Sequence, residues 1–294
     1  DLFAIVWSQQ DQRLFGLNAS GRAPYEWNLE RAREKQLERI PRQSPLSWTV
    51  PGCVSGWAAL NERFGKLDLA RCLEPAIGYA EEGFPVSPVI ATTQFGYWTA
   101  ERFPHLAAVY HPEGKIPRFG DVFKNPFLAR TYRQIAEGGA GAFYEGEIAE
   151  RIVAKSTELG GYMALRDLAD HTADWVEPVT SSYRGFDVWE LPPNGQGIAA
   201  LQMLNILENF EISELEHNSA EHLHLLVEAK RLAFEDRARY YADPTFSDIP
   251  VDWLISKDYA AERAKLIEHE AVSQRVMPGD PELDSDTIYM TAAD

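Results

Sequence analysis

The sequence predicts a helix-rich α+β protein, on three observations. Short apolar runs at residues 2–7 and 14–17, separated by a polar turn, are typical of two strands at the start of the chain. Apolar residues with helical spacing then recur through much of residues 53–159. A strand-like segment at residues 186–191 is followed by a long amphipathic stretch at 219–241. Strands and helix upon helix together indicate the α+β class.

The first helical region contains two predicted helices. Apolar spacing places them at residues 57–60 and 67–80, with Gly65 and Gly83 as plausible ends. Residues 84–124 are rich in Pro, Gly and aromatic side chains, so long ordered loops are expected there rather than regular elements.

Helical patterning returns at residues 126–136 and 146–159. Between them lies a Gly-rich stretch at residues 138–141. It follows a helix and not a strand, and therefore lacks the context of a phosphate or dinucleotide loop. It is predicted to end the first helix in a turn.

In the last third of the chain, residues 186–191 alternate apolar and polar, as in a half-buried strand, and a helix at 198–208 follows. Ser219 is positioned to cap the long helix at 219–241. Its apolar face is predicted from residues spaced three and four apart: Leu223, Leu226, Ala229, Ala233 and Arg237. Acidic helix positions are expected to be solvated: Glu81, Glu82, Glu228, Glu235 and Asp236.

Composition excludes two classes of function. The chain has 28 Lys and Arg against 45 Asp and Glu, a formal net charge of −17, which argues against nucleic-acid binding because that affinity needs cations at phosphates. No apolar run approaches the roughly 18 to 20 residues of a membrane-spanning helix, so no membrane partner is expected. Localisation stays open between the cytoplasm and export.

A metal site is not indicated by the histidines. His217, His222 and His224 fall within eight residues, but on a helix positions 222 and 224 point about 200° apart, so these two cannot share a metal. The motif H-E-x-x-H is absent from the sequence. We expect neither a metal nor an organic cofactor.

One residue at the end of the sequence has the setting of a nucleophile. The acidic, turn-forming stretch at residues 278–286 changes abruptly into a strand-like segment that begins with Thr287. Taken alone this signal is weak, because Thr is simply a good strand former.

Several segments, in order along the chain, resemble the motifs of one enzyme family. With the family motif in parentheses, they are residues 50–52 (V-P-G), 144–153 (F-Y-x-G-x-I-A-x-x-I), 160–168 (G-G-x-[IL]-T-x-x-D-L), 183–186 (Y-R-G), 191–197 (P-P-P-S-S-G-G), 202–208 (Q-x-L-N-I-L-E) and 228–244 (E-A-x-K-x-A-[FY]-x-D-R and a later D-P). The sequence thus resembles the gamma-glutamyltransferase family of N-terminal-nucleophile (Ntn) hydrolases, over nearly its whole length.

The resemblance implies a fold, a division of the chain and a nucleophile. The fold is the four-layer αββα sandwich. Residues 1–286 correspond to the large (alpha) subunit region, shortened at its N-terminus, and residues 287–294 to the first strand of the small (beta) subunit, whose remainder is absent. The family motif T-T-H-x-x-V-V-D aligns with residues 287–294 at Thr287 and Asp294. The precursor would cut itself between Asp286 and Thr287.

Cleavage makes chemical sense for a threonine. A Thr hydroxyl is a poor nucleophile alone, and the freed α-amine of Thr287, with a pKa near neutrality, can serve as its base. The implied reaction is attack of Thr287 on an amide and transfer of the acyl group to water or an amine. The implied partners are a small-molecule amide substrate and the protein's own small subunit, and assembly into a homo-oligomer stays open. The fragment alone is expected to be inactive.

The sequence departs from the family motif at the expected substrate-binding site. Family members that accept gamma-glutamyl substrates carry a motif close to D-x-R-E-x-A-P, whose Arg pairs with the α-carboxylate of the substrate. Here Ser20 stands at that position, and Arg22 lies two residues further on. A hydroxyl replaces neither the charge nor the two-pronged geometry of Arg. Arg22 either restores the charge from a shifted position or is an ordinary structural Arg.

Two alternatives to a gamma-glutamyltransferase remain open. One is an acylase of the same family, acting on glutaryl-cephalosporin-like amides, which the missing Arg favours. The other is a non-catalytic relative that never cuts itself and acts as a binding protein. Its support is the lost Arg together with the pair Ile288 and Tyr289 where the family has Thr and His.

Overall fold

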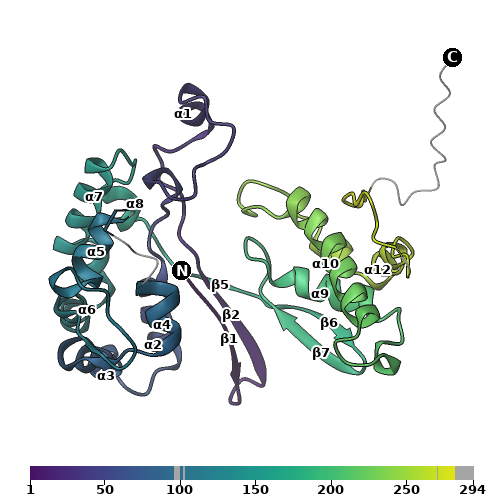
Figure 1. Ribbon diagram of the computed structural model, residues 1–294, viewed down its shortest axis with the longest axis horizontal. Helices are drawn as coiled ribbons and strands as arrows, with labels where there is room; N and C mark the ends of the chain where they lie inside the picture. The colour runs from purple at the N-terminus through teal and green to yellow at the C-terminus, as the bar shows by residue number, and fades with distance from the viewer. Residues whose placement is uncertain (96–99, 102, 270, 282–294) are drawn as a thin grey trace. The chain divides into compact units, whose positions relative to one another are not determined.

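The computed structural model describes residues 1–95, 100–101, 103–269 and 271–281, and forms two compact units (Figure 1). Unit 1 comprises Asp1–Leu2 and Ala19–Asp174, and unit 2 comprises Phe3–Asn18 and the chain from Trp175 onward. The chain therefore leaves unit 2 at the end of strand β2 and returns to it along strand β5.

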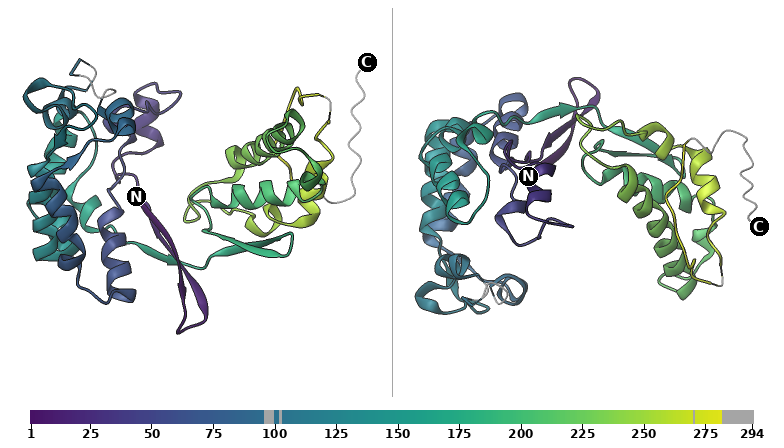
Figure 2. Two further views of the ribbon diagram at one scale, coloured as in Figure 1. Left: turned by 60° about the horizontal axis from the view of Figure 1, so that its bottom comes forward. Right: turned by 90° about the horizontal axis from the view of Figure 1, so that it is seen from above.

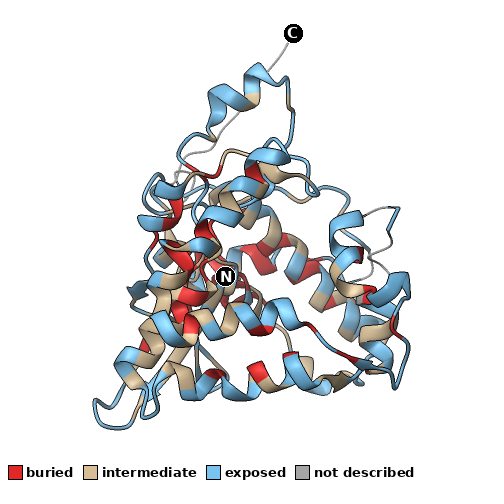
Figure 3. Cartoon of the chain, turned by 90° about the vertical axis from the view of Figure 1, so that its left-hand side faces the viewer, coloured by how far each residue is buried: buried red, intermediate tan, exposed pale blue. Residues whose placement is uncertain are grey.

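Unit 1 is built mainly of helices around one apolar core. Its elements are α1 (Leu29–Glu34), η1 (Pro45–Ser47), α2 (Cys53–Phe64), α3 (Leu69–Glu82), β3 (Phe84–Pro85), α4 (Pro88–Ile90), η2 (Ala91–Phe95), α5 (Pro104–Tyr110), η3 (Pro112–Gly114), β4 (Val122–Phe123), α6 (Pro126–Tyr144), α7 (Glu147–Glu158) and α8 (Leu165–Ala169). Helices α3 and α6 pack along one another, and α7 packs on α6. Figure 3 shows buried and exposed residues alternating along these helices, as expected for amphipathic helices around a core.

The ends of α2 and α3 confirm the two helices predicted there. Gly65 and Gly83 are the C-cap residues, and Gly83 has φ +95°, a conformation that residues with a Cβ rarely adopt. Asp68 caps the start of α3 by accepting a hydrogen bond from the backbone N–H of Arg71 at 2.7 Å. Local capping chemistry thus sets the limits of both helices.

The prediction that residues 138–141 end a helix in a turn is confirmed only in part, since the helical geometry breaks there but no turn follows. Helix α6 continues to Tyr144 and is interrupted only at Gly139, which has φ +64° and ψ −158°. Because glycine adopts this conformation without a Cβ clash, the chain makes one non-helical step and the helix resumes. Gly139 therefore separates two helical segments of α6, which join at a kink.

Residues 84–124 are only partly the loops that were expected. Short helical turns and two short strands occupy more than half of the described segment, and α5 is a seven-residue helix with Pro104 at its first position, where the missing N–H costs nothing. The short strands β3 and β4 pair antiparallel, with Phe84 opposite Phe123. Aromatic packing holds the segment together: the rings of Phe95 and Phe123 lie 4.8 Å apart.

Unit 2 combines small sheets with a helical layer. Its elements are β1 (Leu2–Ser8), β2 (Arg13–Ala19), β5 (Asp174–Val176), β6 (Val179–Tyr183), β7 (Phe186–Glu190), α9 (Gly197–Leu207), η4 (Ile212–Glu214), α10 (Ala220–Tyr240), α11 (Val251–Leu254) and α12 (Lys257–Ala264). Strands β1, β2 and β5 also reach into unit 1 by one residue each. The strand orders are β1-β2-β5 and β6-β7. Helix α9 packs on β6, α10 and α12, and α9 and α10 lie side by side in both views of Figure 2.

The motif Y-R-G has a local physical cause. Strands β6 and β7 pair antiparallel with Tyr183 opposite Phe186, which leaves Arg184 and Gly185 as a two-residue turn. Both have positive φ, at +49° and +87°, as a type I′ hairpin turn requires. The sequence therefore fixes the register of this hairpin locally.

Helix α10 confirms the predicted long helix, and Ser219 caps it by accepting from the N–H of His222 at 3.2 Å. Its buried face shares Ala229 and Ala233 with the predicted one, whereas Leu223 is 45% exposed. The buried residues are Leu225, Glu228, Ala229, Leu232, Ala233 and Asp236. The expectation that Glu228 and Asp236 are solvated is wrong, since their exposed fractions are 1% and 0%, whereas Glu235 is exposed as expected.

Within the described residues, no helix has the length and apolar character to cross a bilayer.

Candidate functional site

The segment that carries Ser20 and Arg22 is fixed by close backbone packing within unit 1. A Cβ on Gly21 would lie 1.7 Å from the carbonyl oxygen of Val50, and a Cβ on Gly52 would lie 2.1 Å from that of Ala19. The backbone N–H of Val50 donates to the carbonyl of Arg22 at 3.0 Å. The two segments therefore pack back to back only because glycine stands at both contacts.

Arg22 is already paired within the chain. Its guanidinium donates to Asp174 with Nη2 and Oδ2 2.8 Å apart, and both side chains are about half exposed. A substrate carboxylate at Arg22 would have to share or displace Asp174. An exposed pair of this kind contributes about 0 to 1 kcal/mol, so such an exchange costs little.

A second segment with family resemblance meets the end of β2 inside unit 2. The side-chain amide of Asn18 donates to that of Asn194 at 2.7 Å. Asn194 belongs to the turn 191–197, and Asn18 opens the stretch that leads to Ser20. Two motifs lying 176 residues apart in the sequence are thus joined directly.

A serine and a histidine that sequence reasoning missed lie together in unit 1. The Ser55 hydroxyl donates to the carbonyl of Gly52 at 2.7 Å and lies 3.1 Å from His171 Nε2. His171 Nδ1 is buried without a partner among the described residues. The consistent arrangement has Nε2–H donating to Ser55, so the hydroxyl proton points away from the ring. The pair is structural and not a nucleophile with its base, and no local pattern joins residues 116 positions apart.

Asp286 and Thr287 lie outside the described residues. The chain that leads toward them is described up to residue 281, and its residues 273–279, here called the anchored segment, are irregular in conformation. Side chains of α10 hold its start. Glu228 accepts from the backbone N–H of Ser273 at 3.2 Å, and Arg231 donates to the Ser273 carbonyl at 2.7 Å and to Glu228 at 2.6 Å.

The end of the anchored segment rests on a buried ion pair. Asp236 accepts from the N–H of Gly279 at 2.9 Å and from the Gln202 amide at 3.0 Å. Arg263, 5% exposed, lies 3.4 Å from Asp236 and donates to the Met277 carbonyl at 2.8 Å. Burial raises the pKa of Asp236 above its ordinary value, against the opposing charge of Arg263.

The Asp236 network was missed because acidic helix residues are usually solvated. A signal was present: Glu228 and Asp236 are eight positions apart on a helix, which places them on one face together with Leu225, Ala229 and Leu232. Carboxylates inside an apolar stripe need partners from elsewhere in the fold, and periodicity does not identify those partners.

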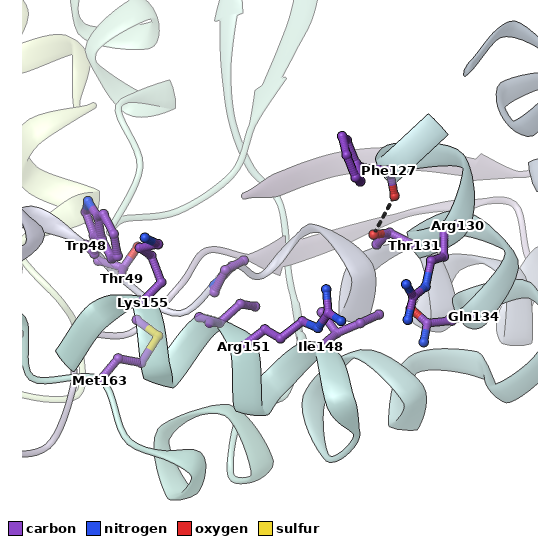
Figure 4. Close-up of a pocket in the computed structure, with 12 residues that line it drawn as sticks. Trp48, Thr49, Phe127, Arg130, Thr131, Gln134, Ile148, Arg151, Lys155 and Met163 are labelled. Carbon is purple, nitrogen blue, oxygen red and sulfur yellow. Dashed lines mark hydrogen bonds between the residues drawn. The ribbon is translucent and has the colours of Figure 1, made fainter. Parts of the chain in front are cut away.

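A cavity of about 590 Å³ in unit 1 holds none of the predicted site residues (Figure 4). Its lining is apolar and basic: Trp48, Thr49, Pro51, Phe127, Arg130, Thr131, Gln134, Ile148, Arg151, Ile152, Lys155 and Met163. Glu147 pairs with Arg151 at 2.7 Å and with Arg130 at 3.3 Å, and Glu158 pairs with Lys155 at 2.7 Å. The cations at this cavity are therefore engaged by carboxylates of the protein itself.

Comparison with known proteins identifies the family. The family model described as gamma-glutamyltranspeptidase matches residues 1–294, and the chain belongs to this family. The chain is 38% identical over 296 residues to the glutathione hydrolase-like YwrD proenzyme of Bacillus subtilis (strain 168), covering 100% of this chain and 55% of the relative. It is 39% identical over 267 residues to the acylase ACY 1 proenzyme of Pseudomonas sp. (strain SE83), covering 88% and 48%. The chain thus spans about half the length of these curated relatives.

Solved structures agree with this assignment. The gamma-glutamyltranspeptidase of Helicobacter pylori superposes with a TM-score of 0.87 at 29% identity, over 98% of this chain and 84% of that one. The cephalosporin acylase of Bacillus halodurans gives 0.85 at 39% identity, over 95% and 52%. The expected fold class, the helix-rich large-subunit region of the α+β Ntn-hydrolase fold, is confirmed.

Proposed function

We propose that the complete protein is a self-processing Ntn hydrolase that transfers an acyl group from an amide to water or an amine. The observation that carries the proposal is the family match over residues 1–294, which includes the segment at 287–294. Two of the similar proteins are named proenzymes, which supports maturation by cleavage into a large and a small subunit.

Maturation proceeds in two steps. The Thr287 hydroxyl attacks the carbonyl carbon of Asp286, the C–N bond breaks, and the hydroxyl proton ends on the nitrogen of Thr287. Water then hydrolyses the resulting ester, leaving the Asp286 carboxylate and a free Thr287 hydroxyl. In the mature enzyme the new α-amine takes the proton from that hydroxyl as it attacks the substrate amide.

The test compares Thr287→Ala and Thr287→Ser with the wild-type complete protein. We expect wild type to give two fragments and an active enzyme, Thr287→Ala to stay uncut and inactive, and Thr287→Ser to retain slow cutting because a hydroxyl is kept. Intact mass follows cutting, and release of an amine from an amide substrate follows activity. A wild-type chain that stays uncut favours the non-catalytic binding protein instead.

Two acyl groups are candidates for the substrate. Gamma-glutamyl amides fit the family as a whole, while the similarity to proteins named acylases favours a glutaryl-type acyl group, which lacks the α-amino group but keeps the terminal carboxylate. The matured enzyme separates them: we expect faster release from a glutaryl amide than from gamma-glutamyl anilide. Strong turnover of the gamma-glutamyl compound contradicts the acylase alternative.

A further inference from the structure

The anchored segment, residues 273–279, is held to its unit by side chains and not by a ladder of backbone hydrogen bonds. Arg263 donates to the Met277 carbonyl, the Tyr240 hydroxyl donates to the Gly279 carbonyl at 2.6 Å, and Asp236 accepts from the Gly279 N–H. Both the N–H and the C=O of Gly279 are therefore fixed, which defines the direction as well as the position of the chain at this point.

Gly279 also fits its site closely. A Cβ added there would lie 2.1 Å from the hydroxyl oxygen of Tyr259, which is buried. Only a residue without a side chain lets the backbone pass this ring and still reach Asp236. The contact makes the register of the anchored segment specific, because a neighbouring residue shifted into this place would clash.

Asp236 and Arg263 orient the anchored segment more than they stabilise the fold. A buried ion pair is often no more stabilising than apolar residues of equal volume, since desolvation offsets the attraction. Asp236 and Arg263 each use further hydrogen bonds on the backbone of the anchored segment or on α9 and α10. Hydrogen bonds have preferred angles, so these groups orient the segment in a way that apolar packing does not.

Gly279 lies seven residues before Asp286. Seven residues span at most about 25 Å when extended, so an anchor at Gly279 restricts where the bond between Asp286 and Thr287 can lie. Self-cleavage is intramolecular and depends on holding the reacting atoms in a near-attack geometry, where an error of about 1 Å costs up to ~100-fold in rate.

We propose that Asp236, Arg263 and Tyr240 are positioning residues for self-cleavage, and that they act through the backbone of Gly279. This inference rests on the proposed function, because it assigns a role in cutting between Asp286 and Thr287. None of the three residues takes part in the chemistry. Each orients the backbone at Gly279, from which the chain continues toward the bond between Asp286 and Thr287.

The test measures the rate of self-cleavage of the freshly synthesised complete precursor by intact mass. Tyr240→Phe removes one hydrogen bond to Gly279, and Gly279→Ala moves the segment away from Tyr259. We expect both variants to cut about tenfold more slowly or worse. Enzyme that has finished cutting is expected to keep the wild-type kcat, because the anchor is not part of the reaction with substrate.

Tyr144→Phe is the matched control. The Tyr144 hydroxyl also donates to a backbone carbonyl at 2.6 Å, that of Pro51, but in unit 1, and it accepts from the backbone N–H of Ser55 at 3.0 Å. Tyr144→Phe removes both hydrogen bonds, so we expect its thermal unfolding midpoint to be at or below that of Tyr240→Phe and its cleavage rate to be that of wild type. Slow cutting by Tyr240→Phe and Gly279→Ala alone supports the inference.

Three other outcomes overturn it. Wild-type rates in Tyr240→Phe and Gly279→Ala show that the anchor does not set the geometry of the bond. Equal slowing in Tyr144→Phe shows a general effect of stability. A wild-type precursor that never cuts refutes the proposed function itself, and the positioning role fails with it.

Discussion

Unit 1 and unit 2 each bury a carboxylate, and they satisfy it in different ways. Asp167 of unit 1, 6% exposed, accepts from the backbone N–H of Tyr25 at 2.8 Å and from that of Ala164 at 2.7 Å, one on each oxygen. Asp236 of unit 2, 0% exposed, accepts from one backbone N–H and one side-chain amide, that of Gln202, and faces Arg263.

The difference lies in which partners can adapt. Backbone amides only donate, so Asp167 needs two acceptor oxygens. The Gln202 amide can turn over and present its carbonyl, and the Tyr241 hydroxyl that now donates to Gln202 can rotate to accept instead. What Asp236 cannot lose without cost is the negative charge opposite Arg263. Asp167 is therefore needed for its two acceptor oxygens, and Asp236 for its negative charge.

Truncation at Asp236 is expected to have the largest effect. Asp236→Ala leaves Arg263 buried without its counter-charge, and breaking a buried pair in this way costs about 3 to 5 kcal/mol. Amide hydrogen exchange on the complete protein measures the loss of local stability around residue 236. We expect faster exchange over residues 199–207 and 273–279 and no change over residues 53–64. An effect below about 1 kcal/mol contradicts a buried, paired Asp236.

Replacement of each carboxylate by an amide is expected to destabilise both sites, and the Asp236 site more. In Asp167→Asn one backbone N–H faces the new NH₂ group, and an unsatisfied buried donor costs about 1 to 3 kcal/mol. In Asp236→Asn the hydrogen bonds can rearrange through Gln202, but Arg263 still loses its buried counter-charge, which costs about 3 to 5 kcal/mol. We therefore expect denaturant unfolding to show Asp236→Asn as the less stable variant. The opposite order contradicts the comparison.

The smallest effect concerns pH and falls in unit 1. Burial, with the charge of Arg22, lowers the pKa of His171 below its ordinary value. Below about pH 6.5 His171 then binds a proton in the unfolded chain but not in the folded chain. The free energy of unfolding therefore falls on acidification, by at most about 1.4 kcal/mol per pH unit. In His171→Gln, whose amide can still donate to Ser55, we expect a shallower loss between pH 7 and 5. Identical slopes for both proteins contradict a buried neutral His171.

The sequence predicts what depends on neighbouring residues and misses what depends on distant ones. Gly65, Gly83 and Ser219 mark helix ends, because capping is decided within a few residues. The turn at Arg184 and Gly185 is equally local.

Distant partners explain the errors. The sequence predicts a solvated Asp236 because its partners are not its neighbours. Gln202, Arg263 and Gly279 lie 27 to 43 residues away in sequence. At the candidate site, Ser20 and Arg22 were located from motif resemblance, yet the pairing of Arg22 with Asp174 depends on a residue 152 positions away.

The most direct test of the account is the position of the cut in the complete protein. N-terminal sequencing of the smaller fragment, with the masses of both fragments, identifies the broken bond. The account predicts a small fragment that begins Thr287, Ile288, Tyr289 and a large fragment that ends at Asp286. A protein that remains a single chain, or a break at any other bond, would contradict it.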